Sequence, residues 1–269
     1  MKMFFSVAAN EGFNLRSIDI RAAFLQAKAL DREVYLELPK DIKKEGKIWR
    51  LKKPLYGLNN ASRRFWLRIK KVFTDTGLES LDSDEAFYFK YDKSGKLIGM
   101  ISSHVDNFNL ARTDKFIKDV TKEIEAALNV SKVEDNNFQF TGIDVKKTND
   151  GIEISMEDYA MSLEEIEIRD GRNTEPLTRE ELKVLRKYVG KLSWLAAGTR
   201  PDISVCALEL AKKQKNATLG DLKHINRVVK KVQENNNKVT FKRVADKNEF
   251  CLMAVSDASY KEEDLSLEK

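Results

Sequence analysis

Short apolar stretches with the period of a β-strand and longer ones with the period of an α-helix are interleaved over the first half of the chain. Residues 2–10 are mostly apolar or small as far as Glu11-Gly12, which predicts a helix that the glycine ends. The next patterns predict a strand at 13–20 with Asp19 near its end, a helix at 21–29, a strand at 33–38 that Pro39 ends, and a short strand at 48–51.

A basic amphipathic helix is predicted next, over residues 61–76. Its apolar positions recur at helical spacing and its other positions are rich in cations: Phe65, Ile69, Val72 and Phe73 against Arg63, Arg64, Arg68, Lys70 and Lys71. Further on, the patterns predict strands at 86–91 and 97–102, a helix at 115–128, and strands at 138–146 and 152–155. Asp106 and Asn107 lie between two strand-like runs, as at the tip of a hairpin.

Helical periodicity takes over after Thr178. The apolar positions form two faces: Leu182, Leu185, Val189, Leu192 and Leu195 on one, and Leu222, Ile225, Val228, Val229 and Val232 on the other. Strand patterns return at 239–244 and 250–255. We therefore expect an α+β fold whose mixed part, 1–155, is followed by a helical part, 156–237, and by a last segment with strands, 238–269.

Composition narrows the possible chemistry. The chain has 269 residues and a net charge of +5, which permits a polyanionic partner without requiring one. Two cysteines and two histidines are too few for a zinc cluster, so a bound metal would have oxygen ligands. We find no signal peptide and no apolar run of the length that a membrane span needs, so we expect no membrane partner. The two widely spaced cysteines favour an intracellular protein.

Two aspartates are candidates for metal-dependent phosphoryl transfer. This chemistry needs carboxylates from separate chain segments that converge on a pair of hard cations. Asp19, at a predicted strand end, and Asp106, at a predicted hairpin tip, satisfy that requirement. The pairing alone is weak, because the chain has 43 acidic residues and most such groups are solvated at the surface.

A series of motifs strengthens the case. In chain order these are SIDIRAAFL at 17–25, EVYLELP at 33–39, LKKPLYGL at 51–58, SHVDN at 103–107, FTGI at 140–143, GKL at 190–192 and TRPDI at 199–203. The series resembles the reverse transcriptase of Ty1/copia-type retrotransposons over almost the whole chain. The resemblance implies a polymerase palm with partial fingers at 1–155, a helical thumb or connection at 156–237, and a truncated start of a ribonuclease H-like domain at 238–269. Asp257 matches a metal ligand of that domain, but we expect a solvated acid at a strand end, because the domain is truncated.

The same resemblance implies roles for individual residues. Asp19 and Asp106, with Asn107 beside them, would form the catalytic set, and the two aspartates would bind two Mg²⁺ ions. Phe24, Tyr56, Gly57 and Arg63 would bind the incoming deoxynucleoside triphosphate, and Phe140 and Gly142 would support the primer on an RNA or DNA template. The alternatives are a capping aspartate, a core phenylalanine and an ordinary tight turn around Gly57.

Several positions depart from the family pattern. Asn107 replaces a second aspartate and offers a neutral oxygen, so metal binding should weaken. His104 replaces a tyrosine, Asn109 an apolar residue, and 59–62 a lysine-glutamine and small-proline pattern. The basic strands that precede the first aspartate in the family are also missing, so we expect truncated fingers.

These departures leave two functions open. One is a reverse transcriptase that is catalytically impaired in this copy, and the other is a non-catalytic, nucleic-acid-binding remnant of a retroelement. The cationic helix at 61–76 could flank a nucleic-acid duplex in a polymerase-like context, or it could be an ordinary solvated face. The same holds for a second helix with the cations Lys223, Arg227, Lys230 and Lys231. We expect Trp49, Trp66 and Trp194 to lie in the core, and the sequence leaves the oligomeric state undecided.

Overall fold

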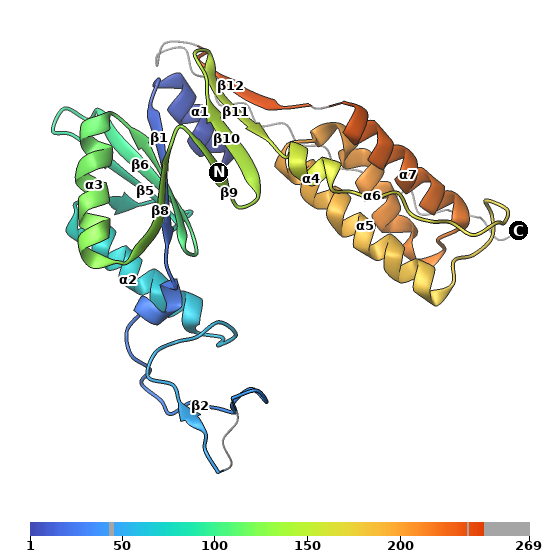
Figure 1. The fold of residues 1–269 in the computed structure, drawn as a ribbon. Coiled ribbons are helices and arrows are strands. Elements are labelled where there is room, and N and C mark those ends of the chain that lie inside the picture. The colour runs from blue at the N-terminus through green and yellow to red at the C-terminus, as the bar shows by residue number, and fades with distance from the viewer. Residues whose placement is uncertain (43–45, 236, 245–269) are drawn as a thin grey trace, which may run out of the picture.

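A six-stranded antiparallel sheet dominates the first part of the structure, a computed structural model that describes residues 1–42, 46–235 and 237–244 (Figure 1). The strand order is β4-β5-β6-β7-β1-β8. The strands are β1 (Asn14–Ile20), β4 (Glu79–Ser80), β5 (Phe87–Tyr91), β6 (Leu97–His104), β7 (Asn107–Arg112) and β8 (Val130–Asp135). The helices associated with it are α1 (Lys2–Asn10), α2 (Ala61–Asp75) and α3 (Asp114–Ala127).

The two faces of this sheet pack against different helices. Because successive side chains of a strand point to opposite faces, Ile18 and Phe108 are buried against α2 and α3, whereas Leu15 and Ala111 are buried in a second cluster that includes α1. The helices at 2–10, 61–76 and 115–128 that the periodicity predicts are confirmed to within about two residues at each end.

A smaller sheet follows, with the order β12-β11-β10-β9. Its strands are β9 (Asn137–Phe140), β10 (Ile143–Lys147), β11 (Gly151–Ser155) and β12 (Val239–Lys242). The segment 138–146, which we predicted as one strand, is two strands, because Thr141 and Gly142 take positive φ values of 50° and 77° and form a two-residue turn. β12 hydrogen bonds to β11, while the predicted strand at 250–255 and Asp257 lie outside the described residues.

The segment between β1 and α2 has less regular structure than its sequence pattern indicates. The predicted helix at 21–29 is wrong: a single short 3-10 turn, η1 (Ala23–Gln26), is present, preceded by Ala22 in the left-handed region and followed by extended backbone. The side-chain amide of Gln26 donates instead to the carbonyl oxygens of Arg21 and Asn129. Tertiary hydrogen bonds thus override local helix propensity here.

Only two residues of each predicted strand, at 33–38 and at 48–51, form a strand in the structure. β2 (Tyr35–Leu36) and β3 (Trp49–Arg50) form a small hairpin that projects from the body of the protein (Figure 1). Trp49 is 51% exposed and Trp194 is 46% exposed, so the prediction that both are core residues is wrong.

The helical part lies to one side of the two sheets (Figure 1). It contains α4 (Glu157–Met161), α5 (Arg179–Gly198), η2 (Pro201–Ile203), α6 (Ser204–Lys212), η3 (Lys213–Lys215) and α7 (Leu219–Glu234). A capping box starts α5, where Thr178 Oγ1 accepts from Glu181 N and Glu181 accepts from Thr178 N. The predicted apolar faces are buried, except that Leu182 is partly exposed.

The TRPDI segment joins the ends of two helices. Arg200 is 2% exposed and donates two hydrogen bonds to the Asp202 carboxylate, each 2.9 Å long. Its Nη1 also donates to the carbonyl oxygens of Val232 and Asn235, at 3.0 and 2.8 Å. These carbonyls end α7 and lack partners within the helix, so the buried guanidinium connects the end of α5 to the end of α7.

This ion pair predicts a pH-dependent stability. Hydrogen bonds from Arg200 lower the pKa of the Asp202 carboxyl below its ordinary value. A carboxyl with a lowered folded-state pKa stabilises the fold above its unfolded-state pKa, about 3.9, and this stability is lost as the pH falls through the folded-state value. We expect Asp202→Asn to lower the free energy of unfolding at neutral pH by about 1–3 kcal/mol, because it leaves the buried arginine without its carboxylate.

Urea unfolding from neutral to acid pH measures this effect. The difference between the parent and Asp202→Asn should shrink below about pH 4, where the parent carboxyl becomes protonated too. Asp170→Asn, at an exposed position, is the matched control and should follow the parent throughout. A difference that stays constant down to acid pH would show that the charge of Asp202 is irrelevant.

Candidate active site

The pairing of β1 with β7 brings the predicted catalytic residues together. Asp19 and Asn107 are directly opposite in the antiparallel register, so their side chains emerge on the same face of the sheet. Asp106 lies in the turn just before β7, and its carbonyl oxygen accepts from Ile20 N at 2.8 Å. This face is opposite to the one that α2 and α3 cover, because the intervening Ile18 and Phe108 point into the helix-packed cluster.

The turn that carries Asp106 has an unusual backbone. Val105 has a φ of 53°, which is rare for a β-branched residue, and its side chain is 44% exposed. Since backbone strain of this kind persists only where the surrounding structure imposes it, the pairing of β6 with β7 must hold the turn in place. The result is a tight two-residue connection that holds Asp106 next to the end of β1.

A neighbouring hydroxyl orients the Asp19 carboxylate. Ser131, on β8, donates from Oγ to Asp19 Oδ2 and lies 3.1 Å from the Asp19 carbonyl oxygen. The sequence pattern does not predict Ser131 as a site residue, because β8, the strand that pairs with the other edge of β1, carries only a weak signal. Of residues 130–135 only Val130 and Val133 are apolar, and they do not alternate with the polar residues.

An aromatic pair lies beside the aspartates. Tyr56 Oη donates to Asp106 Oδ2 at 3.2 Å, and its ring centroid is 4.4 Å from that of Phe24. Partial burial, followed by the charges of Asp106 and Asp19, raises the pKa of the Tyr56 hydroxyl above its ordinary value. Gly57 has a φ of 95°, a conformation that favours glycine. Tyr56 therefore reaches the carboxylates, whereas Phe24 is 6% exposed and packs behind Tyr56 as part of the core cluster that includes α2.

The remaining predicted site residues are Arg63, Phe140 and Gly142. Arg63 is exposed at the start of α2, and within the part of the chain that the structure describes no hydrogen bond or ion pair joins it to either aspartate. Phe140 is 2% exposed, and its ring centroid is 6.4 Å from that of His104 at the end of β6. The β9–β10 hairpin, whose turn contains Gly142, thus contacts the β6–β7 hairpin that carries Asp106.

Asp19, Asp106 and Asn107 together provide only part of the charged oxygen ligands that a hard cation prefers. Asp19 and Asp106 supply carboxylate oxygens, and Asn107 supplies at most an amide oxygen on the same face. Over residues 1–42, 46–235 and 237–244 there is no group of three or more His, Cys, Asp or Glu residues placed to hold a metal ion. The geometry therefore provides two charged ligands where a fully charged two-metal site would have more.

Comparison with known proteins identifies the class. The family model described as "Reverse transcriptase (RNA-dependent DNA polymerase)" matches residues 1–177, more than half of the chain. The chain belongs to this family. In the part of the chain that the structure describes, no helix is long and apolar enough to cross a membrane.

Individual relatives are retrotransposon polyproteins. The chain is 24% identical over 280 residues to the "Retrovirus-related Pol polyprotein from transposon RE1" of Arabidopsis thaliana, an alignment that covers 97% of this chain and 18% of that protein. It is 28% identical over 113 residues to the corresponding polyprotein from transposon TNT 1-94 of Nicotiana tabacum, covering 41% of this chain and 8% of that protein. The chain thus spans less than a fifth of these relatives, and the resemblance to copia-type polyproteins is confirmed.

The buried side chain of Asn109 should lower the free energy of unfolding. Its side chain is fully buried between Ser17 and Ser102 in the sheet, and its oxygen and nitrogen have no hydrogen-bond partner in the described structure. An unsatisfied buried amide costs about 1–3 kcal/mol, so Asn109→Leu, which has a similar volume, should raise the free energy of unfolding by about that amount in urea titrations.

An exposed position supplies the control for this substitution. Asn149→Leu, in the turn between β10 and β11, should change the free energy of unfolding by less than about 0.5 kcal/mol. A loss of stability in Asn109→Leu would mean that the amide has a structural role which the hydrogen-bond geometry does not reveal.

Proposed function

We propose that this chain carries the template-directed DNA polymerase site of a copia-type reverse transcriptase and that the site is impaired in this copy. The observation that carries the proposal is the register of β1 and β7, which sets Asp19 opposite Asn107 and beside Asp106. Two carboxylates converge from separate segments, as metal-dependent phosphoryl transfer requires, and an amide occupies the position of a third ligand.

Each residue would have a distinct task. Asp19 and Asp106 would hold Mg²⁺, which supplies positive charge that neutralises nucleotide phosphates. Ser131 would keep the Asp19 carboxylate in one orientation, and the hydroxyl of Tyr56 would do the same for Asp106. The exposed ring of Tyr56, backed by the buried ring of Phe24, would form the apolar wall against which the sugar and base of the deoxynucleoside triphosphate rest.

Asn107 explains why we expect low activity. Each carboxylate ligand contributes a full negative charge to a divalent cation, whereas an amide oxygen contributes only a dipole. The position is otherwise well placed, because the strand register presents the side chain on the same face as Asp19. Restoring a carboxylate at position 107 should therefore strengthen metal binding without a change in backbone geometry.

A second candidate function, nucleic-acid binding without catalysis, rests on α5. Its solvent-exposed positions form a stripe at helical spacing: Lys183, Arg186, Lys187, Gly190, Ser193, Trp194 and Ala197. The first part of the stripe consists of cations. The second part consists of small residues and of Trp194, which is 46% exposed. Such a surface can lie against the backbone of a template–primer duplex, with cations on phosphates and the indole against a sugar or base.

Primer extension tests the catalytic proposal. We expect little extension by the parent with Mg²⁺ on an RNA template, a gain of at least about tenfold in Asn107→Asp, and no extension by Asp19→Ala, because the charge at position 107 limits metal binding. Asn149→Asp adds the same charge in an exposed turn and should behave as the parent does.

Three outcomes would contradict parts of the proposal. Strong extension by the parent that Asp19→Ala abolishes would show that Asn107 is no impediment. Extension that survives in Asp19→Ala would mean that the active site has been placed wrongly. Silence in every variant would favour the binding-only function, provided that circular dichroism shows folded proteins.

Duplex binding tests the role of α5. A Cβ at Gly190 would have no atom of the described residues within 4 Å, so Gly190→Leu should fold normally. We expect both Gly190→Leu and Trp194→Ala to weaken binding of a labelled RNA–DNA duplex by about tenfold in fluorescence anisotropy, the first by blocking close approach and the second by removing the indole contact.

Leu208→Ala is the matched control for this measurement. Leu208 is 56% exposed on α6, outside the stripe, and its truncation should leave binding unchanged. Equal losses in Leu208→Ala and Trp194→Ala would indicate nonspecific apolar adhesion. Binding that neither stripe variant affects would place the duplex on another surface.

A further inference from the structure

The side-chain amide of Gln26 closes the loop that follows β1. Its Nε2 donates to the carbonyl oxygen of Arg21 at 2.6 Å and to that of Asn129 at 3.1 Å, and its Oε1 accepts from Asn129 N at 2.7 Å. Arg21 N donates to the same Asn129 carbonyl oxygen, at 3.0 Å. Both backbone groups of Asn129 are thus bonded to the loop at 21–26.

These hydrogen bonds continue the pairing of β1 with β8 beyond the end of β1. The regular register ends where Ile20 is opposite Val130. Asn129 directly precedes Val130, and the amide of Gln26 offers it one donor and one acceptor, as the backbone of a neighbouring strand would. A side chain therefore takes the place of the backbone that leaves the sheet at this point.

The backbone of the loop is strained and needs such an attachment. Ala22 has a φ of 48° and a ψ of 49°, in the left-handed region that a residue with a Cβ rarely adopts. Strain of this kind persists only where the surrounding structure imposes it. Because Gln26 bonds to the carbonyl oxygen of Arg21, directly before Ala22, its amide opposes the relaxation of this turn.

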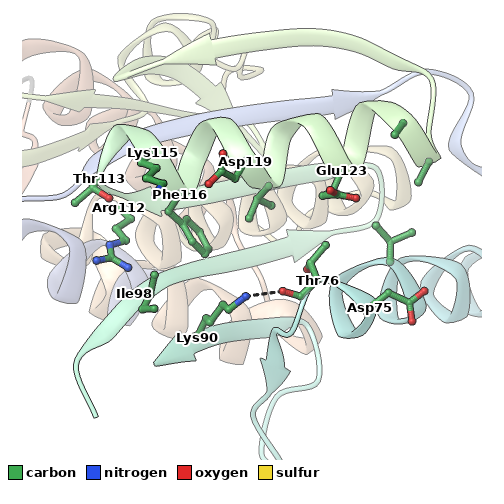
Figure 2. Close-up of a pocket in the computed structure, with 14 residues that line it drawn as sticks. Asp75, Thr76, Lys90, Ile98, Arg112, Thr113, Lys115, Phe116, Asp119 and Glu123 are labelled. Atoms are coloured by element: carbon green, nitrogen blue, oxygen red, sulfur yellow. Dashed lines mark hydrogen bonds between the residues drawn. The ribbon is translucent and has the colours of Figure 1, made fainter. Parts of the chain in front are cut away.

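The junction of α3 and β8, to which the loop is attached, is firmly packed. Figure 2 shows α3 lying along the sheet, with Phe116 turned toward the strands. The Phe116 ring rests on the backbone of Gly99, where a Cβ would lie 2.3 Å from it. At the other end of α3, Leu128 is buried, and Arg68 on α2 donates to the Ala127 carbonyl oxygen at 2.6 Å. This junction is therefore a fixed point for the loop.

The loop carries the buried ring that supports the apolar wall of the candidate active site. Phe24, two residues before Gln26, packs behind Tyr56, which is 59% exposed. The hydroxyl of Tyr56 donates to Asp106 Oδ2. A displacement of the loop would therefore be transmitted through two aromatic rings to the wall and to Asp106.

We propose that Gln26 is a positioning residue, a role that rests on the proposed polymerase function: its amide holds Phe24 behind Tyr56 and keeps the wall ready to receive the deoxynucleoside triphosphate. Without the amide, the loop spends only part of its time in that arrangement, and the apparent affinity for the nucleotide falls in proportion to that fraction. Saturating nucleotide selects the competent arrangement, so the rate at saturation changes little.

Primer extension by the full chain with Asn107→Asp as the background measures this role. Gln26→Met has a similar length and no hydrogen-bonding group, and we expect it to raise KM for the deoxynucleoside triphosphate by about tenfold while kcat stays within about twofold. Gln26→Glu keeps the acceptor for Asn129 N but sets a negative charge against two carbonyl oxygens, so it should raise KM at least as much. It also serves as the second variant if Gln26→Met does not fold.

Gln233→Met is the matched control. Gln233 Nε2 likewise donates to two carbonyl oxygens, those of Ala160 at 3.4 Å and Leu163 at 2.7 Å, but in the helical part of the chain. Its loss should leave KM unchanged. An unchanged KM in both Gln26 variants, an equal rise in Gln233→Met, or a fall in kcat without a rise in KM would overturn the proposal.

Amide hydrogen exchange without nucleotide separates this role from the proposed polymerase function. Gln26→Met should accelerate exchange in peptides that cover 21–27 and 128–131 by at least about fivefold, while peptides from α5 keep the parent rate. If Asn107→Asp extends no primer, the proposed function fails and exchange alone decides. Faster exchange in Gln26→Met then supports the role of Gln26 in holding the loop, and an unchanged rate overturns it.

Discussion

The antiparallel register between β1 and β7 is the constraint on which the rest of the site depends. It sets Asp19 opposite Asn107 and brings the carbonyl oxygen of Asp106 to Ile20 N. Because side chains alternate along a strand, the same register sends Ile18 and Phe108 into the cluster beneath α2 and α3. A shift of one residue would bury the aspartate and expose the apolar side chains, so the packing energy of the core also fixes the geometry of the carboxylates.

Elements from distant parts of the sequence then complete the site around that pairing. Ser131 reaches Asp19 from the other neighbour of β1, and Tyr56 reaches Asp106 from the segment before α2 while its ring packs on Phe24. The hairpin of β9 and β10 contacts the hairpin of β6 and β7 through Phe140 and His104. These contacts give the two carboxylates defined orientations, yet they supply no further negative charge to replace the one that position 107 lacks.

Two amides in β7 affect different properties of the protein. Asn107 lies on the surface of the candidate active site, where its neutrality bears on metal binding. Asn109 is fully buried, has no hydrogen-bond partner among the described residues and bears on stability. At the other end of the same strand, the buried Nε and Nη1 atoms of Arg112 also lack partners in the part of the chain that the structure describes. β7 thus combines a well-defined register with an unusual number of unsatisfied polar groups.

Sequence alone determined the elements with strong periodicity, the family and the candidate carboxylates. The helices α2, α3, α5 and α7 follow from apolar spacing, and Asp19 and Asp106 follow from ordered motifs, because both signals are local in the chain. Only the tertiary structure decided that residues 21–29 form no regular helix, that β8 carries Ser131 to Asp19, and that Trp194 is exposed. Those outcomes depend on hydrogen bonds and packing between residues far apart in the chain, and local pattern carries little information about such contacts.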